Sequence, residues 1–93
     1  MDKEEALNVA KVKLLELRKF SYTELQRFLI PESVEVTSEN GSKYQVEVHA
    51  FWDDKKGSDL RVTVSVDNFG ILSSIFPMSL DFIISSDGTY VGE

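Results

Sequence analysis

Strict alternation of apolar and polar residues between Val34 and Val66 is the feature that most constrains the fold. Because successive side chains of a β-strand point to opposite faces, the stretches 34–37, 44–52 and 60–66 each predict a strand with one apolar face. Strands of this kind are typical of an antiparallel sheet that is covered on one side and wet on the other. The apolar face consists of Val34, Val36, Tyr44, Val46, Val48, Ala50, Trp52, Leu60, Val62, Val64 and Val66.

The turn between the first two strands allows their register to be predicted, because opposed residues of an antiparallel pair point to the same face. A two-residue loop would oppose Thr37 and Tyr44 and mix the two faces. A three-residue loop, residues 39–41, instead opposes Val36 and Tyr44. It also puts Gly41 where a left-handed backbone is wanted. We therefore predict the three-residue loop.

Residues from Lys3 to about Lys19 follow a helical period instead. Their apolar stripe consists of Ala6, Leu7, Ala10, Leu14 and Leu17. Three more apolar residues, Val9, Val12 and Leu15, fall outside the stripe. The helix is therefore either covered on more than one side or leaves an apolar strip for a partner, and we expect further contact within the domain.

A second, short helix is predicted after the first. Ser21 and Glu24 have the spacing of a capping box, which would open a helix that runs to about Leu29. Pro31 then ends it, since a proline pushes the preceding residue toward an extended backbone.

Beyond residue 67 the pattern is less decisive. Apolar residues at 71–76 would lie on both faces of a strand that Pro77 ends, so the buried side is not specified. A further short strand is expected at 81–85, followed by a turn at 86–88.

These segments predict one α+β domain over residues 1–93, a length that supports a single core. In the expected architecture the N-terminal helix and the short second helix pack on one face of an antiparallel meander of four or so strands. The expected core consists of Leu7, Leu14, Leu17, Val46, Val48, Trp52, Val62 and Val64.

Charge is unevenly distributed along the chain. The net charge is −6, and residues 31–93 hold four basic and eleven acidic side chains, against six and five in residues 1–30. A negative field repels phosphate backbones and anionic lipid, so nucleic acid and membranes are not expected as partners. It is compatible with a basic protein partner, although plain solubility explains it as well.

The composition also bounds location and chemistry. The absence of cysteine excludes disulfides, thiolate metal sites and cysteine nucleophiles. The first residues are acidic, whereas a signal peptide would begin with basic residues, and no apolar stretch is as long as the roughly 20 residues that a membrane span needs. Both features favour a cytosolic protein. No cofactor motif is present, because the glycines are dispersed through turns and form neither GxGxxG nor a P-loop.

Candidate functional residues lie mainly on the polar face of the predicted sheet. His49 is the only histidine, and alternation places it near Glu47 and Phe51, with Arg61 or Thr63 opposite. A histidine paired with a carboxylate can act as a general base, but no nucleophile is indicated by spacing. Solvated polar side chains are the simpler interpretation.

The loop after the second strand and the outward phenylalanine are further candidates. Asp53, Asp54 and Asp59 could offer oxygens to a hard cation, but their spacing is not that of an EF-hand and two lysines interrupt them. We predict no metal there. Phe51 should point outward, where it either anchors a partner or is covered by the second helix or the C-terminal segment.

Several short segments carry a resemblance to known proteins: 34–37, 44–48, 51–54, 59–62 and the tail Asp87-Gly88-Thr89-Tyr90-Val91-Gly92-Glu93. With these segments, residues 33–93 resemble a group of small bacterial proteins of unknown function. The resemblance implies a bacterial origin and a compact domain in which the 52–54 loop and the tail are of interest. It implies no substrate, cofactor or catalytic residue.

Two classes of function follow from these features. The leading hypothesis is a non-enzymatic protein-interaction module, in a sharper form an immunity or antitoxin-type inhibitor of a basic partner, with Glu47, His49, Phe51, Arg61, Asp53 and Asp54 as binding residues. The alternative is a small ligand-binding protein or enzyme with a pocket between helix and sheet, using His49 or Arg61. A monomer and a homodimer are equally compatible with the sequence.

Overall fold

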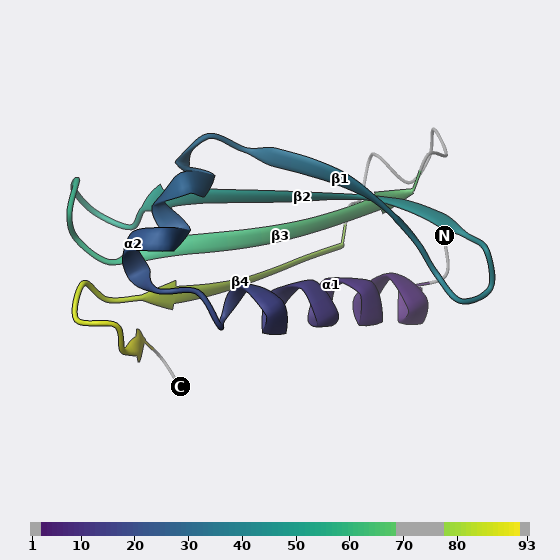
Figure 1. The fold of residues 1–93 in the computed structure, drawn as a ribbon, viewed down its shortest axis with the longest axis horizontal. Helices are drawn as coiled ribbons and strands as arrows, with labels where there is room; N and C mark the ends of the chain where they lie inside the picture. Colours follow the sequence, from purple (N-terminus) through teal and green to yellow (C-terminus); the bar gives the residue numbers. More distant parts are fainter. Residues whose placement is uncertain (1–2, 69–77, 92–93) are drawn as a thin grey trace.

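The structure, a computed structural model, describes residues 3–68 and 78–91. Two helical segments precede an antiparallel sheet, so the predicted α+β class is confirmed (Figure 1). The helical elements are α1 (Lys3–Leu17), α2 (Tyr22–Leu25) and the 3-10 helix η1 (Gln26–Leu29). The strands are β1 (Glu32–Thr37), β2 (Lys43–Trp52), β3 (Leu60–Asn68), β4 (Met78–Ile84) and β5 (Tyr90–Val91).

The described strands form one meander in the order β1-β2-β3-β4-β5, each antiparallel to the next. In the first hairpin Val36 is paired with Tyr44, and the Ser38 N–H donates to the Ser42 carbonyl at 2.8 Å. Gly41 has a φ of +90°, which is the left-handed backbone that the loop requires. The three-residue loop and its register are therefore confirmed.

The core lies between the helices and one face of the sheet. The apolar residues of β2 and β3 from Tyr44 to Ala50 and from Leu60 to Val66 are buried, as their alternation predicts. Of the expected core, Leu14 and Trp52 are partly buried and pack against its edge, whereas Leu7 lies half-exposed outside the cluster. Ala6 and Ala10 of the same stripe are fully buried, because small side chains let the backbone of α1 approach the sheet.

The helices cover the sheet unevenly. α1 packs over β3 and β4, and η1 packs over β2. The inner face of β1 is left without a helix above it, and Val34 remains 45% exposed although it shares the core side of the sheet. Val12 and Leu15 are 67% and 60% exposed, so the expected further contact within the domain is wrong for these two residues.

The second helical segment begins as predicted. The Ser21 hydroxyl accepts from the Glu24 N–H, and the Glu24 carboxylate accepts from the Ser21 N–H, which completes the capping box. One α-helical turn then tightens into η1. The Tyr22 hydroxyl donates to the Ser58 carbonyl at 2.7 Å, and this ties the helical segment to the β2–β3 loop.

The C-terminal part differs from its prediction in two respects: Tyr90–Val91, expected as part of the tail, form β5, and β4 begins earlier than expected. β4 starts at Met78, three residues before the strand expected at 81–85, because the pairing of Val66 with Met78 extends the ladder with β3. The expected strand at 71–76 and Pro77 lie outside the described residues. Within the part of the chain that is described, no helix has the length and apolarity needed to cross a membrane.

Candidate functional site

The predicted site residues on the sheet lie together on the face that points away from the helices, here called the open face. Pairing partners point to the same side, so the open face is composed of rows that run across the strands. Glu47, His49 and Phe51 come from β2, and Arg61 comes from β3. No described helix packs on this face, and all of its described residues are exposed or half-exposed.

In one row of paired residues on the open face, apolar side chains lie on both sides of Arg61. Phe51 is paired with Arg61, Arg61 with Ile83, and Ile83 with Val91. The row therefore crosses four strands, which at about 4.8 Å between strands spans roughly 14 Å. Phe51 is 38% exposed and Val91 43% exposed. We call these four residues the Phe51 row.

The charge in the Phe51 row is held between two carboxylates. A terminal nitrogen of Arg61 lies 3.0 Å from Asp53 Oδ1, and the other lies 2.7 Å from Asp81 Oδ2. Hydrogen bonds to Asp53 and then to Asp81 raise the pKa of Arg61 above its ordinary value. The guanidinium is thus bound by a carboxylate on each side, and the three groups together have a net charge of −1.

His49 lies beside the Phe51 row. Its ring contacts the ring of Phe51 edge-to-face, with 5.0 Å between centroids, and its strand partner is Thr63. Among the described residues no hydrogen bond joins His49 to Glu47 or to a hydroxyl group. The general-base arrangement considered from the sequence is therefore not assembled here.

Glu47 and Asp54 flank the row at a distance. Glu47 is exposed on β2 opposite Ser65, and Asp54 is exposed in the loop after β2. Asp53 turns back to Arg61, while its N–H donates to the Asp59 carbonyl at 2.8 Å. In the described part of the chain, no group of three or more His, Cys, Asp or Glu residues is placed to hold a metal ion.

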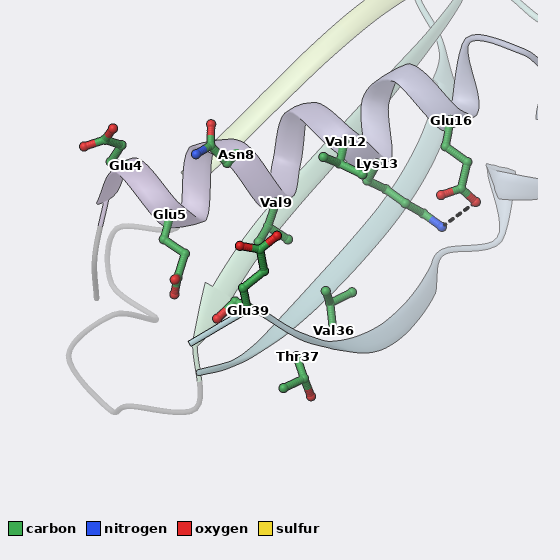
Figure 2. Close-up of a pocket in the computed structure, with 11 residues that line it drawn as sticks. Glu4, Glu5, Asn8, Val9, Val12, Lys13, Glu16, Val36, Thr37 and Glu39 are labelled. Atoms are coloured by element: carbon green, nitrogen blue, oxygen red, sulfur yellow. Dashed lines mark ion pairs between the residues drawn. The ribbon is translucent and has the colours of Figure 1, made fainter. Parts of the chain in front are cut away.

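A pocket lies on the other side of the sheet, between α1 and β1 (Figure 2). Its volume is about 700 Å³. Val9 and Val12 from α1 and Val36 from β1 provide its apolar lining. We call it the α1–β1 groove. The remaining lining residues are Glu4, Glu5, Asn8, Lys13, Glu16, Thr37, Ser38 and Glu39.

The α1–β1 groove is acidic at one end. Figure 2 shows Glu5 near the N-terminal end of α1 and Glu39 below Val9, with Glu4 pointing away from β1, and it shows the ion pair of Lys13 with Glu16 at the other end. That pair has a nitrogen-to-oxygen distance of 3.6 Å. Glu5 also accepts a hydrogen bond of 2.5 Å from the Tyr44 hydroxyl, which joins the groove to β2.

The groove was only partly foreseeable. The position of Val9 and Val12 outside the helical stripe was a signal, since it left open an apolar strip for a partner. That α1 packs over β3 and β4 and not over β1 depends on the lateral position of α1, which no local pattern specifies. His49 and Arg61, which the sequence analysis associated with a helix–sheet pocket, do not line this groove.

Comparison with protein-family models, with curated proteins and with solved structures found no match to this chain. Its function is therefore inferred from the geometry of the open face and of the groove.

Proposed function

We propose that the protein is a non-enzymatic, cytosolic protein-interaction module that binds a basic partner through the open face of its sheet. The observation that supports this function most directly is the Phe51 row, where solvent-exposed apolar side chains lie on both sides of an arginine fixed by two aspartates. An exposed aromatic residue in a polar setting is a typical anchor of a protein interface.

The carboxylates around the row support a basic partner. Asp53 and Asp81 have one cation between them, and Glu47 and Asp54 add further negative charge nearby. Such a surface steers a positively charged protein and disfavours an acidic one. Because Arg61 is already held in place, little side-chain freedom remains to be lost there when a partner binds.

A sharper form of the proposal is an immunity or antitoxin-type inhibitor of a basic toxin. The support is again the combination of an apolar anchor and surrounding carboxylates, which suits the blocking of a positively charged substrate-binding surface. A gene for a toxic basic protein next to the gene for this chain is the expected genomic arrangement. Rescue of growth when both are expressed together is the measurement.

The binding surface is tested by capture from an extract of the native cell with the full chain as bait. We expect a basic protein to be retained, and Phe51→Ala to weaken its affinity about thirtyfold or more, since truncating a buried aromatic anchor usually costs about 2 kcal/mol or more. Charge reversal by Glu47→Lys should weaken it further. The matched control is Ile30→Ala, which removes another exposed apolar side chain outside the open face.

The open-face proposal is rejected if Phe51→Ala and Ile30→Ala retain the partner equally well. Circular dichroism of each bait shows whether the fold is intact, so that a loss of capture is assigned to the surface and not to unfolding.

A small-ligand binder is the second candidate, and the α1–β1 groove is the observation in its favour. Its volume of about 700 Å³ lies within the range of ligand pockets. Its valines would contact an apolar group, and its carboxylates would attract a positive charge, so the ligand would be an apolar cation. Chemical-shift changes confined to the groove on addition of benzyltrimethylammonium would support this candidate.

A further inference from the structure

β1 exposes apolar side chains and a strand edge at the same place. Val34 is 45% exposed and Val36 half-exposed, and Val9 and Val12 of α1 lie across the groove. Isolated exposed valines are ordinary, but here valines from two elements line one concavity. The groove therefore offers apolar surface for side chains that enter it from the outer side of β1.

The backbone of β1 is available at that outer side. In the described sheet β1 is the edge strand and pairs with β2 only. Alternate N–H and C=O groups of an edge strand point away from the sheet, and an added strand can pair with them. A small ligand would fill the groove without using this edge, whereas an extended segment would use both.

The charge of the groove indicates what kind of segment fits. Four glutamates and one lysine line it, and the lysine, Lys13, is paired with Glu16. Glu39 and Glu5 lie toward the other end of the groove, where Glu5 also accepts the hydrogen bond from Tyr44, and Glu4 points away from β1 (Figure 2). A second copy of the chain, with a net charge of −6, would be repelled, and a basic segment would be attracted.

We propose that the α1–β1 groove binds an extended basic and apolar segment of a partner protein, which pairs with β1 as an added strand. Its alternate apolar side chains contact Val12 and Val36, and a lysine or arginine lies at the acidic end near Glu39. This site lies on the opposite side of the sheet from the Phe51 row, so it stands or falls independently of the proposed function.

The probe is a synthetic heptapeptide with blocked termini, one residue longer than β1, that has valine at positions 2 and 4, lysine at position 6 and serine at the odd positions. Its valines and its lysine point to the same side of an extended strand, and it is called the lysine–valine peptide. Titrated into the isotope-labelled full chain, it should shift the amide resonances of β1 and of the α1 turns that line the groove. The lysine–serine peptide, with serine in place of both valines, has the same charge and should bind about tenfold more weakly, because it lacks the apolar contacts.

Two variants of the chain form the matched pair. Val12→Ser changes a groove residue and should weaken binding of the lysine–valine peptide about fivefold. Leu15→Ser changes a similarly exposed residue of the same helix that does not line the groove, and it should leave binding unchanged. Both positions are more than half exposed, so neither variant is expected to unfold the chain.

Two further peptides test the pairing with β1. One has its odd and the other its even amides N-methylated, so each loses the hydrogen-bond donors along one edge. We expect one of the two to lose binding and the other to retain it, because only one edge of the added strand faces β1.

Five results would overturn the proposal. If the lysine–serine peptide binds as tightly as the lysine–valine peptide, the binding is simple charge attraction. The same follows if Val12→Ser binds the lysine–valine peptide as tightly as the wild type does. Retained binding of both methylated peptides would exclude strand pairing. A dimer in sedimentation analysis that Val12→Ser dissociates would make a second copy the occupant. Binding of benzyltrimethylammonium in the groove as tight as that of the peptide would make it a small-ligand site.

Discussion

Several charged side chains of the described structure are held on the exposed surface by ion pairs or ring contacts with residues of other elements. Arg61 joins Asp53 and Asp81 across three elements, and Arg18 lies over the ring of Tyr90 at 4.4 Å from its centroid. Exposed pairs of this kind contribute little to stability, with typical values of about 0 to 1 kcal/mol. Their effect is to fix positions: Arg61 within the open face, and the C-terminal strand against the end of α1.

Asp87 in the β4–β5 turn gives a prediction about pH. Hydrogen bonds from the Ser85 hydroxyl, the Thr89 hydroxyl and the Thr89 N–H lower its pKa from 3.8 to about 2. A carboxyl group with a lowered pKa in the folded state stabilises the fold above its ordinary pKa, and this contribution is lost as the pH falls toward 2. Asp87→Asn should therefore lower Tm at neutral pH and flatten its fall between about pH 4 and pH 2.

Thermal melts at a series of pH values measure this effect. Asp54→Asn is the control, because Asp54 is an exposed loop carboxyl with no ion pair among the described residues. If Tm falls between about pH 4 and pH 2 as steeply in Asp87→Asn as in the wild type, the turn does not contribute to acid sensitivity.

At the scale of elements, turns and caps determine where each segment ends. The capping box at Ser21 starts α2, and left-handed glycines lie in the β1–β2, β2–β3 and β4–β5 turns. The hydroxyls of two tyrosines then tie distant elements together, Tyr22 to the carbonyl of Ser58 and Tyr90 to that of Arg18. These contacts explain why a helical segment as short as α2 has a defined place beside the sheet.

Gly41 is the element-scale test. Its φ of +90° disfavours any side chain, and a Cβ at this position would meet no atom within 4 Å, so the cost of substitution is backbone strain alone. Gly41→Ala should destabilise the fold by about 1 to 2 kcal/mol, and Gly41→Asn by less, because asparagine adopts the left-handed region more readily. Urea denaturation of the two variants and the wild type measures the difference.

Equal stability of Gly41→Ala and wild type would mean that the hairpin contributes nothing to the global free energy of unfolding. In that case β1 would open separately, and its amides would exchange faster than those of β3.

The whole molecule has one continuous core among its described residues, shared by α1, α2, η1 and the inner faces of β2, β3 and β4. Trp52 lies at the edge of this core, and its ring is 6.2 Å from that of Tyr22. Its fluorescence therefore reports on the contact of helix and sheet, while circular dichroism reports on the backbone as a whole.

We expect a single cooperative unfolding transition, because small domains with one core rarely populate intermediates. Denaturation curves from Trp52 fluorescence and from far-ultraviolet circular dichroism should coincide. An earlier fluorescence transition would show that the α2 segment detaches before the sheet unfolds.

The sequence by itself determined the α+β class, the faces of β2 and β3, the capping box and the register of the first hairpin. These features depend on neighbours along the chain or on the parity of opposed residues, which alternation makes explicit. It also placed Glu47, His49 and Phe51 on one face, and the structure shows that face without a described helix over it.

Tertiary structure alone decided the lateral position of α1, and with it the exposure of Val12 and Val34 and the existence of the α1–β1 groove. It also decided that Arg61 joins Asp53 and Asp81, and that Leu7, unlike the other four residues of the apolar stripe, lies outside the core. The physical reason is that a helix stripe specifies which side is buried but not which strands it covers. That choice depends on the close packing of side chains that are far apart in the sequence.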